Sequence, residues 1–105
     1  MANHTAVLTA LADPTRRAIF ERLARAPSAV GELARELPVS RPAVSQHLKV
    51  LKSAGLVTDQ AAGTRRVYSV DSAGVAASRE YFEQFWQQSL ASFRTAASKP
   101  AQEET

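Results

Sequence analysis

The feature that most constrains the fold is a short amphipathic segment, Arg41 to Ala54, with helix-ending residues on both sides. Ser40 is placed to cap its first turn, and Pro42 falls within that turn, where proline is tolerated. Gly55 can adopt the left-handed conformation that ends many helices. Between these ends, apolar residues recur at helical spacing on a single stripe: Val44, Leu48 and Leu51. The segment is therefore predicted to be a helix with one buried face.

A shorter helix is predicted just before it, from about Val30 to Glu36, with three inward residues: Val30, Leu33 and Leu37. Only Pro38-Val39-Ser40 separates the two helices. Two helices joined by so few residues are typical of a helix-turn-helix.

After Gly55, the spacing of the apolar residues no longer fits a helix. Residues 56–60 and 65–70 are short and β-prone, and a turn is expected at Ala61-Ala62-Gly63-Thr64. These segments predict a hairpin that carries Arg65 and Arg66 at its tip.

The remaining segments complete a fold of class α+β, mainly α with a small β-hairpin. A first short helix has Val7, Leu8 and Leu11 on one face, and Asp13-Pro14 is a cap-and-start signal for a second helix. A last long helix begins at Asp71 or Ser72 and runs to about Ala97. We therefore expect a winged helix-turn-helix of order α-α-α-α-β-β-α, one domain over residues 1–97, and a frayed tail over 98–105.

Composition favours a cytoplasmic globular protein. The chain has 105 residues and no cysteine, which excludes disulfides and thiolate metal sites. No secretory signal is expected in Met1–Leu11, and no apolar run is long enough to span a bilayer, so no membrane association is predicted. The formal net charge is +3, but residues 35–66 hold six basic and two acidic residues. Positive charge gathered in the middle of the chain is typical of a nucleic-acid surface, although a solvated basic face would have the same composition.

The outer face of the Arg41–Ala54 helix carries no acidic residue. Gln46 can read adenine in the major groove, Arg41 can read guanine, and Ser45 can contact either base. Lys49 and Lys52 lie further along and are expected to meet phosphates. The alternative is an ordinary solvated helix, but such helices usually carry glutamate as well as lysine.

The arginines of the hairpin are a second basic feature. Adjacent strand side chains point to opposite faces, so at least one of Arg65 and Arg66 should reach outward, to the phosphate backbone or the minor groove. Charges at a strand edge can also serve only to block aggregation. Next to a candidate recognition helix, the DNA interpretation is favoured.

Four strings of the chain, in this order, closely resemble the ArsR/SmtB family of winged-helix repressors: Leu11-Ala12-Asp13-Pro14-Thr15-Arg16-Arg17, Val30-Gly31-Glu32-Leu33-Ala34, Arg41-Pro42-Ala43-Val44-Ser45-Gln46-His47-Leu48-Lys49-Val50-Leu51 and Ala54-Gly55-Leu56-Val57. The resemblance covers about Leu8 to Val70. It implies a homodimeric repressor that leaves a palindromic operator in double-stranded DNA when an inducer binds. The residues expected at DNA are, in the recognition helix, Ser40, Arg41, Pro42, Ser45, Gln46, His47, Lys49 and Lys52, and, in the wing, Thr64, Arg65 and Arg66.

The sequence departs from the metal-sensing members of that family. It has no cysteine, and its two histidines are His4, near the terminus, and His47, between the DNA face and the buried stripe. Glu80 and Glu83 alone make a poor transition-metal site, because such ions prefer nitrogen or sulfur ligands. We therefore predict no metal and no cofactor, and the sequence leaves the small-molecule effector unidentified.

The last helix holds five of the seven aromatic residues. Exposed together, they would exceed the apolar patch that monomers usually tolerate. Part of the stripe is expected to cover its own domain, and the rest could line a ligand pocket or form a two-fold interface with the first helix; the interface is favoured. The residues expected there are Val7, Leu8, Leu11, Phe82, Phe85, Trp86, Leu90 and Phe93.

Two other classes of function were weighed against a transcriptional regulator. A winged-helix protein-interaction module predicts acidic or bulky apolar residues on the outer face of the Arg41–Ala54 helix, and neither is present. For an enzyme, the sequence offers no Ser-His-Asp order and no glycine-rich phosphate loop, and we assign no carboxylate pair to catalysis. We therefore predict a DNA-binding regulator without catalytic activity.

Overall fold

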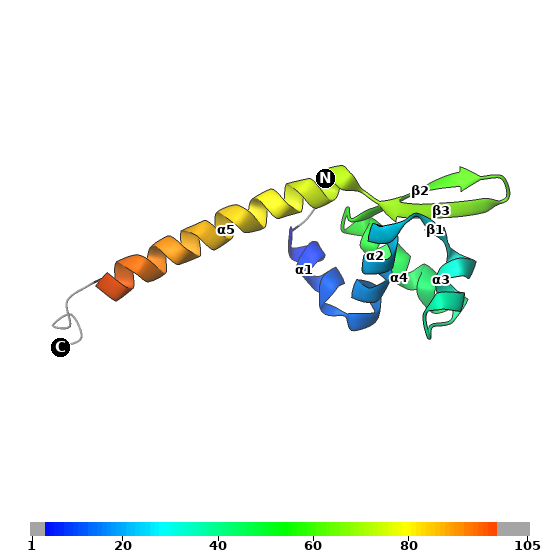
Figure 1. Ribbon diagram of the computed structural model, residues 1–105, viewed down its shortest axis with the longest axis horizontal. Helices are drawn as coiled ribbons and strands as arrows, with labels where there is room; N and C mark the ends of the chain where they lie inside the picture. The colour runs from blue at the N-terminus through cyan, green and yellow to red at the C-terminus, as the bar shows by residue number, and fades with distance from the viewer. Residues whose placement is uncertain (1–3, 99–105) are drawn as a thin grey trace.

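The structure is a computed structural model that describes residues 4–98. Its elements, in order, are α1 (His4–Ala12), α2 (Pro14–Arg25), β1 (Ser28–Ala29), α3 (Val30–Glu36), α4 (Arg41–Ser53), β2 (Val57–Ala62), β3 (Arg65–Val70) and α5 (Ser72–Ser98). Figure 1 shows α1–α4 gathered under a small sheet, with the hairpin at one end and α5 extending from the other. The predicted fold class is confirmed, with helix-turn-helix α3–α4 and the wing β2–β3.

The predicted helix boundaries are confirmed by their caps. The Asp13 carboxylate accepts a hydrogen bond from the Arg16 backbone N–H, and the Ser40 hydroxyl accepts one from the backbone N–H of Ala43. Each satisfies a donor that the first turn of a helix leaves free. Gly55 has a φ of 79°, the left-handed conformation expected after the end of α4.

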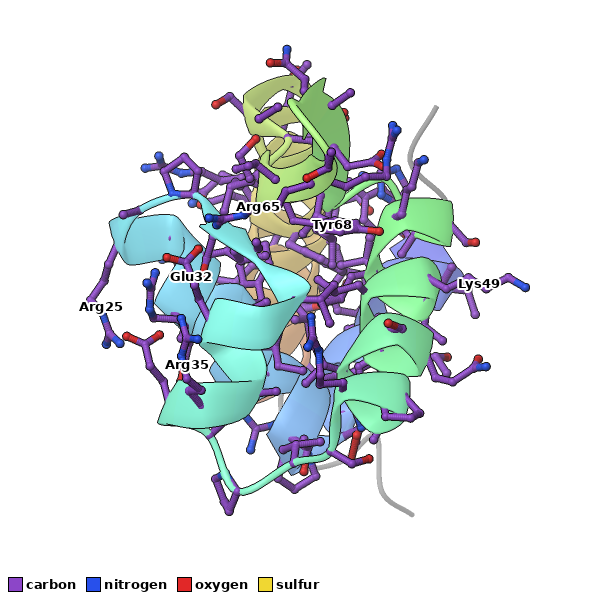
Figure 2. All side chains as sticks on the ribbon, turned by 90° about the vertical axis from the view of Figure 1, so that its right-hand side faces the viewer. Arg25, Glu32, Arg35, Lys49, Arg65 and Tyr68 are labelled. Atoms are coloured by element: carbon purple, nitrogen blue, oxygen red, sulfur yellow. The ribbon has the colours of Figure 1, made fainter. Side chains whose placement is uncertain are left out.

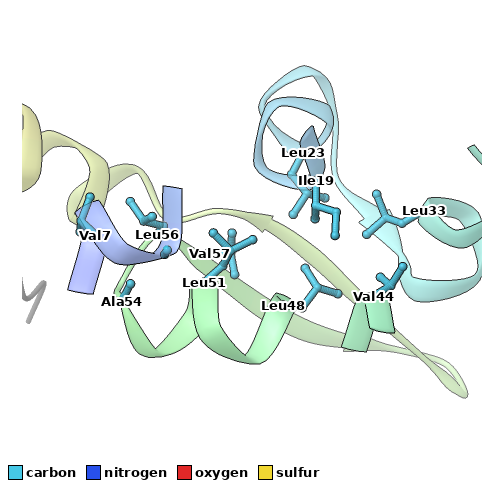
Figure 3. Close-up of a cluster of buried hydrophobic side chains, with 11 residues drawn as sticks. Val7, Ile19, Leu23, Leu33, Val44, Leu48, Leu51, Ala54, Leu56 and Val57 are labelled. Atoms are coloured by element: carbon cyan, nitrogen blue, oxygen red, sulfur yellow. The ribbon is translucent and has the colours of Figure 1, made fainter. Parts of the chain in front are cut away.

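A single apolar core lies between the helices and the sheet (Figure 3). The inward stripe of α4 is fully buried and packs against side chains from α1, α2, α3 and β2; the larger members of this core are Val7, Ile19, Leu23, Leu33, Val44, Leu48, Leu51, Leu56 and Val57. The helix that was predicted to bury one face does so. Its opposite face is consequently turned outward.

Two details of the sheet differ from the prediction. Ser28 and Ala29 form a short third strand that pairs with Tyr68 and Val67, so the sheet has the order β1-β3-β2. The predicted four-residue turn is also too long, because Ala61 and Ala62 belong to β2, opposite Arg66 and Arg65. Backbone pairing with β3 overrides the low β propensity of alanine there.

Helix α5 leaves the domain as a long projecting rod (Figure 1). The radius of gyration is 18.8 Å, whereas a compact chain of this length has about 13 Å. Ser98 is the last helical residue; the rest of the predicted frayed tail, 99–105, lies outside the described residues. Within residues 4–98, no helix has the length and apolar character needed to cross a membrane.

Candidate nucleic-acid interface

The outer face of α4 presents its polar side chains to solvent. Ser45, Gln46 and Lys49 are exposed, and none of them has a side-chain hydrogen bond or ion pair to another residue within 4–98. Lys49 points away from the protein in Figure 2. Packing on the opposite stripe of α4 therefore holds a row of polar groups that remain available to an external ligand.

The start of α4 is fixed against α3. Arg41 and Pro42 are exposed, and the guanidinium of Arg41 lies across Gly31, so close that a Cβ at that glycine would be 3.1 Å from its Nη2. Ser40 is also exposed, but its hydroxyl is used as the cap. These contacts orient the first turn, which carries Arg41.

His47 lies partly inside and has partners within the chain. Its Nδ1 is 3.6 Å from the Asp13 carboxylate and 3.5 Å from Nη1 of Arg16, and its side chain is about one-fifth exposed. These contacts tie α4 to the start of α2. The structure thus gives His47 an anchoring position at the edge of the outer face rather than one on it.

The Asp59 carboxylate joins the end of α4 to the wing. Lys52 Nζ lies 2.7 Å from Oδ1, and Arg66 Nε donates to Oδ2 at 2.6 Å. The Asp59 side chain is only 6% exposed, whereas Lys52 and Arg66 are more than half exposed. Hydrogen bonds from Lys52 and then Arg66 lower the pKa of Asp59, and the carboxylate raises the pKa of Arg66.

The other wing arginine is held by α3. Arg65 Nη2 lies 2.9 Å from Oε1 of Glu32, and the same carboxylate oxygen accepts the backbone N–H of Ala29 at 2.9 Å (Figure 2 labels both side chains). The backbone hydrogen bond from Ala29 is the largest cause that lowers the pKa of Glu32, and the charge of Arg65 adds to it. Arg65 and Arg66, on opposite faces of β3, are therefore braced against different elements of the domain.

An open cleft of about 750 Å³ lies between α3, the start of α4 and the wing. Four arginines line it, with Glu32 as the acidic residue among them: Arg35, Arg41, Arg65 and Arg66. Thr64, exposed in the hairpin turn, also lines the cleft. The outer face of α4 and this cleft together form a continuous basic region, which we call the basic surface.

The sequence prediction did not include Glu32 and Asp59. Glu32 lines the cleft and Asp59 lies next to it on β2, and both are engaged by cations of the basic surface. The pairing of β2 with β3 could have suggested the contact of Asp59 with Arg66. Asp59 pairs with Tyr68, and Arg66 lies two residues from Tyr68 on the same face of the sheet. The Glu32–Arg65 contact spans 33 residues and has no local sequence signal.

A second exposed feature is the apolar surface of α5. Phe85, Trp86 and Phe93 are 54%, 61% and 69% exposed, and Leu8 of α1 is 59% exposed. Tyr81, which the prediction did not include, is also exposed and stacks on the His4 ring at 3.9 Å between centroids. The projecting helix thus carries large side chains that its own domain does not cover.

Not every predicted interface residue is equally exposed. The prediction for Val7 is wrong, because its side chain is 2% exposed and packs in the domain core, which leaves no surface for a partner. Leu11 and Phe82 pack partly against the same core, and Leu90 is half-buried. The free apolar surface is therefore Leu8 with Phe85, Trp86 and Phe93.

Within residues 4–98, no three His, Cys, Asp or Glu side chains lie together in a way that could hold a metal ion.

A helix-turn-helix domain family matches residues 11–60. The HTH-type transcriptional regulator Rv2034 of Mycobacterium tuberculosis (strain ATCC 25618 / H37Rv) is 67% identical over 84 residues, 80% of this chain and 78% of that protein. The solved structure of an ArsR-like transcriptional regulator from Rhodococcus sp. RHA1 is similar with a TM-score of 0.77 and 32% identity, covering 92% of this chain and 94% of the other. The chain belongs to the ArsR/SmtB family.

A further solved relative describes an assembly. The solution NMR structure of the homodimeric winged helix-turn-helix DNA-binding domain Mb0332 of Mycobacterium bovis, a possible ArsR-family regulator, has a TM-score of 0.65 and 30% identity over 82% of this chain and 80% of that domain. The family resemblance of the sequence is thus confirmed, and this ArsR/SmtB member is a DNA-binding transcriptional regulator. The individual DNA contacts stay predictions.

Proposed function

We propose that this ArsR/SmtB protein is a dimeric repressor that occupies a palindromic operator in the cytoplasm and blocks transcription from it. The observation that carries the proposal is the exposed, acid-free outer face of α4 beside the arginines of the wing. Ser45 and Gln46 of that face have no partner within residues 4–98. A helix of this kind fits the major groove, where Gln46 would contact adenine. Lys49 and the wing arginines would contact phosphates.

The apolar surface of α5 supports the dimeric form. A fully buried aromatic side chain covers about 150–250 Å², and more than half of Phe85, Trp86 and Phe93 is still exposed and available to a partner. A symmetric pair would cover Leu8, Phe85, Trp86 and Phe93 of both copies, and the homodimeric relative supports the same assembly. Two recognition helices held in this way would read half-sites about 34–36 Å apart.

Quantitative gel shifts on the DNA upstream of the gene test the proposal. We expect one fragment to bind more tightly than random DNA of equal length at physiological salt. If the dimer neutralises about eight phosphates, the logarithm of the binding constant falls with the logarithm of salt at a slope near −7. A uniform affinity for all fragments would leave no operator and would contradict the proposal.

The Gln46→Ala variant separates base reading from phosphate contact. Removing a side chain that contacts a base edge should cost about 1–3 kcal/mol of discrimination at one base pair, while affinity for random DNA changes little. Lys49→Ala is the matched control, because it should weaken operator and random DNA alike and reduce the salt slope by about one per subunit. If both variants lose preference equally, the assigned roles are wrong.

A further inference from the structure

We propose that Asp59 is a positioning residue of the DNA interface: its carboxylate holds Lys52 of α4 and Arg66 of β3 side by side, with their free N–H groups directed to the phosphate backbone. The inference rests on the proposed function, because it assumes that the basic surface contacts DNA. It adds a role for an acidic residue on a surface that binds a polyanion.

The N–H groups of Lys52 and Arg66 that Asp59 does not use can bind a phosphate. An ammonium has three N–H groups and a guanidinium has five. Arg66 uses its Nε for Asp59, so both of its terminal nitrogens remain free within residues 4–98, and Lys52 engages Asp59 through its one nitrogen, Nζ, at 2.7 Å. Both cations are more than half exposed. Each can therefore keep its bond to Asp59 and still donate to an external oxygen.

The double pairing of the carboxylate argues against a simple latch that phosphate displaces. Lys52 Nζ lies 2.7 Å from one Asp59 oxygen and Arg66 Nε lies 2.6 Å from the other, so a phosphate would have to break two charge-assisted contacts to remove Asp59. The Glu32–Arg65 pair differs, because both of its side chains are 42% exposed or more, and exposed pairs contribute little. Of the two acidic residues, Asp59 is the one built to stay in place when DNA binds.

Three elements meet at this carboxylate. Lys52 lies in the last turn of α4, Asp59 in β2 and Arg66 in β3. The recognition helix and the wing are thus connected through side chains as well as through the chain itself. Asp59 thereby pre-orders two long side chains that would otherwise lose conformational freedom at binding.

The Asp59→Asn variant distinguishes positioning from plain electrostatics, because the two predict opposite signs. The variant raises the net charge by one, so long-range attraction alone predicts tighter binding. Loss of pre-ordering predicts binding about three- to tenfold weaker, from the cost of immobilising two long side chains. The salt slope should stay unchanged, because both cations are still present. Glu21→Gln, an exposed acid on α2 without an ion pair within residues 4–98, is the charge-matched control.

Affinities are measured for the operator fragment in two backgrounds, wild type and Lys52→Ala/Arg66→Ala. The proposal expects Asp59→Asn to weaken binding in the first and not in the second, because Asp59 acts through those cations. Equal weakening in both backgrounds indicates a general loss of fold and overturns the proposal, as does tighter binding by Asp59→Asn. If wild-type protein has no preferred fragment, the proposed function fails instead.

A measurement on the wild-type protein tests the same proposal without relying on the folding of a variant. The Arg66 Nε–H resonance should be protected from exchange in free protein and remain so in the DNA complex. Its loss of protection on adding DNA would mean that phosphate displaces Asp59, and the positioning role would be wrong.

Discussion

Gly74 leaves no room for a side chain. A Cβ at this position would clash with the carbonyl oxygen of Gly55, so the start of α5 is in direct contact with the turn that ends α4. The Asp71 carboxylate accepts the N–H of Gly74, and the Asp71 N–H donates to the carbonyl of Leu56. Backbone atoms, rather than flexible side chains, make this contact.

Gly74→Ala should therefore destabilise the protein, although alanine has the higher helix propensity. Propensity offers at most about 1 kcal/mol, whereas forcing a methyl group into a filled space costs about 1–3 kcal/mol or more. Chemical denaturation measures the difference. Gly31→Ala is the matched control, because its methyl group meets only the flexible end of Arg41, and it should be neutral or slightly stabilising. Equal effects at both glycines would contradict the steric argument.

Asp59 should also affect stability in a pH-dependent way. Its pKa is lowered in the folded state by Lys52 and Arg66, so its contribution is complete above the ordinary pKa of aspartate and is lost as pH falls through the lowered value. We expect wild type to be more stable than Asp59→Asn at pH 7, and the gap to shrink between about pH 5 and pH 2. Denaturation curves at several pH values provide the check; a constant gap would show that the ion pairs contribute nothing.

Helix α4, the proposed recognition helix, is the part of the molecule where local signals agree. Ser40, Pro42 and Gly55 bound α4, and the apolar stripe fixes its buried face, so its outer face could be predicted from sequence. The contacts of the wing could not, because Glu32 and Asp59 approach the arginines only after the sheet has formed. The strand Ser28–Ala29 was missed because two residues are too few to show alternation.

The wing should supply affinity rather than sequence preference. Replacing Arg65 and Arg66 together by alanine removes two exposed cations from each subunit. Binding to operator and random DNA should fall by similar factors, and the magnitude of the salt slope should fall by up to about four per dimer. Salt titrations on both DNAs measure this. A selective loss of operator binding would instead place an arginine at base edges in the minor groove.

The molecule is extended because most of α5 packs against no other element within residues 4–98. Its principal extents are 68 × 26 × 20 Å, and its exposed aromatic residues lie mainly beyond the domain. Most of the stability of a helix in a protein comes from packing of its apolar face, so the exposed apolar side chains of α5 favour a second copy that covers them.

Trp86→Ala together with Phe93→Ala should therefore shift the protein toward monomer without unfolding the domain, since both side chains are exposed and outside its core. Sedimentation measured over a range of concentrations tests this, with Gln88→Ala on another face of α5 as control. We expect the doubly substituted protein to lose operator affinity by more than tenfold, because one half-site then binds alone. Unchanged sedimentation would show that the dimer interface does not depend on Trp86 and Phe93.

The contact between Gly74 and Gly55 has a mechanical consequence for a pair of subunits. Helix α5, which would join the copies, starts against the turn that ends α4, and a side chain at Gly74 would not fit between them. In a dimer joined through α5, a change in the angle between the two α5 helices would therefore change the distance between the two α4 helices.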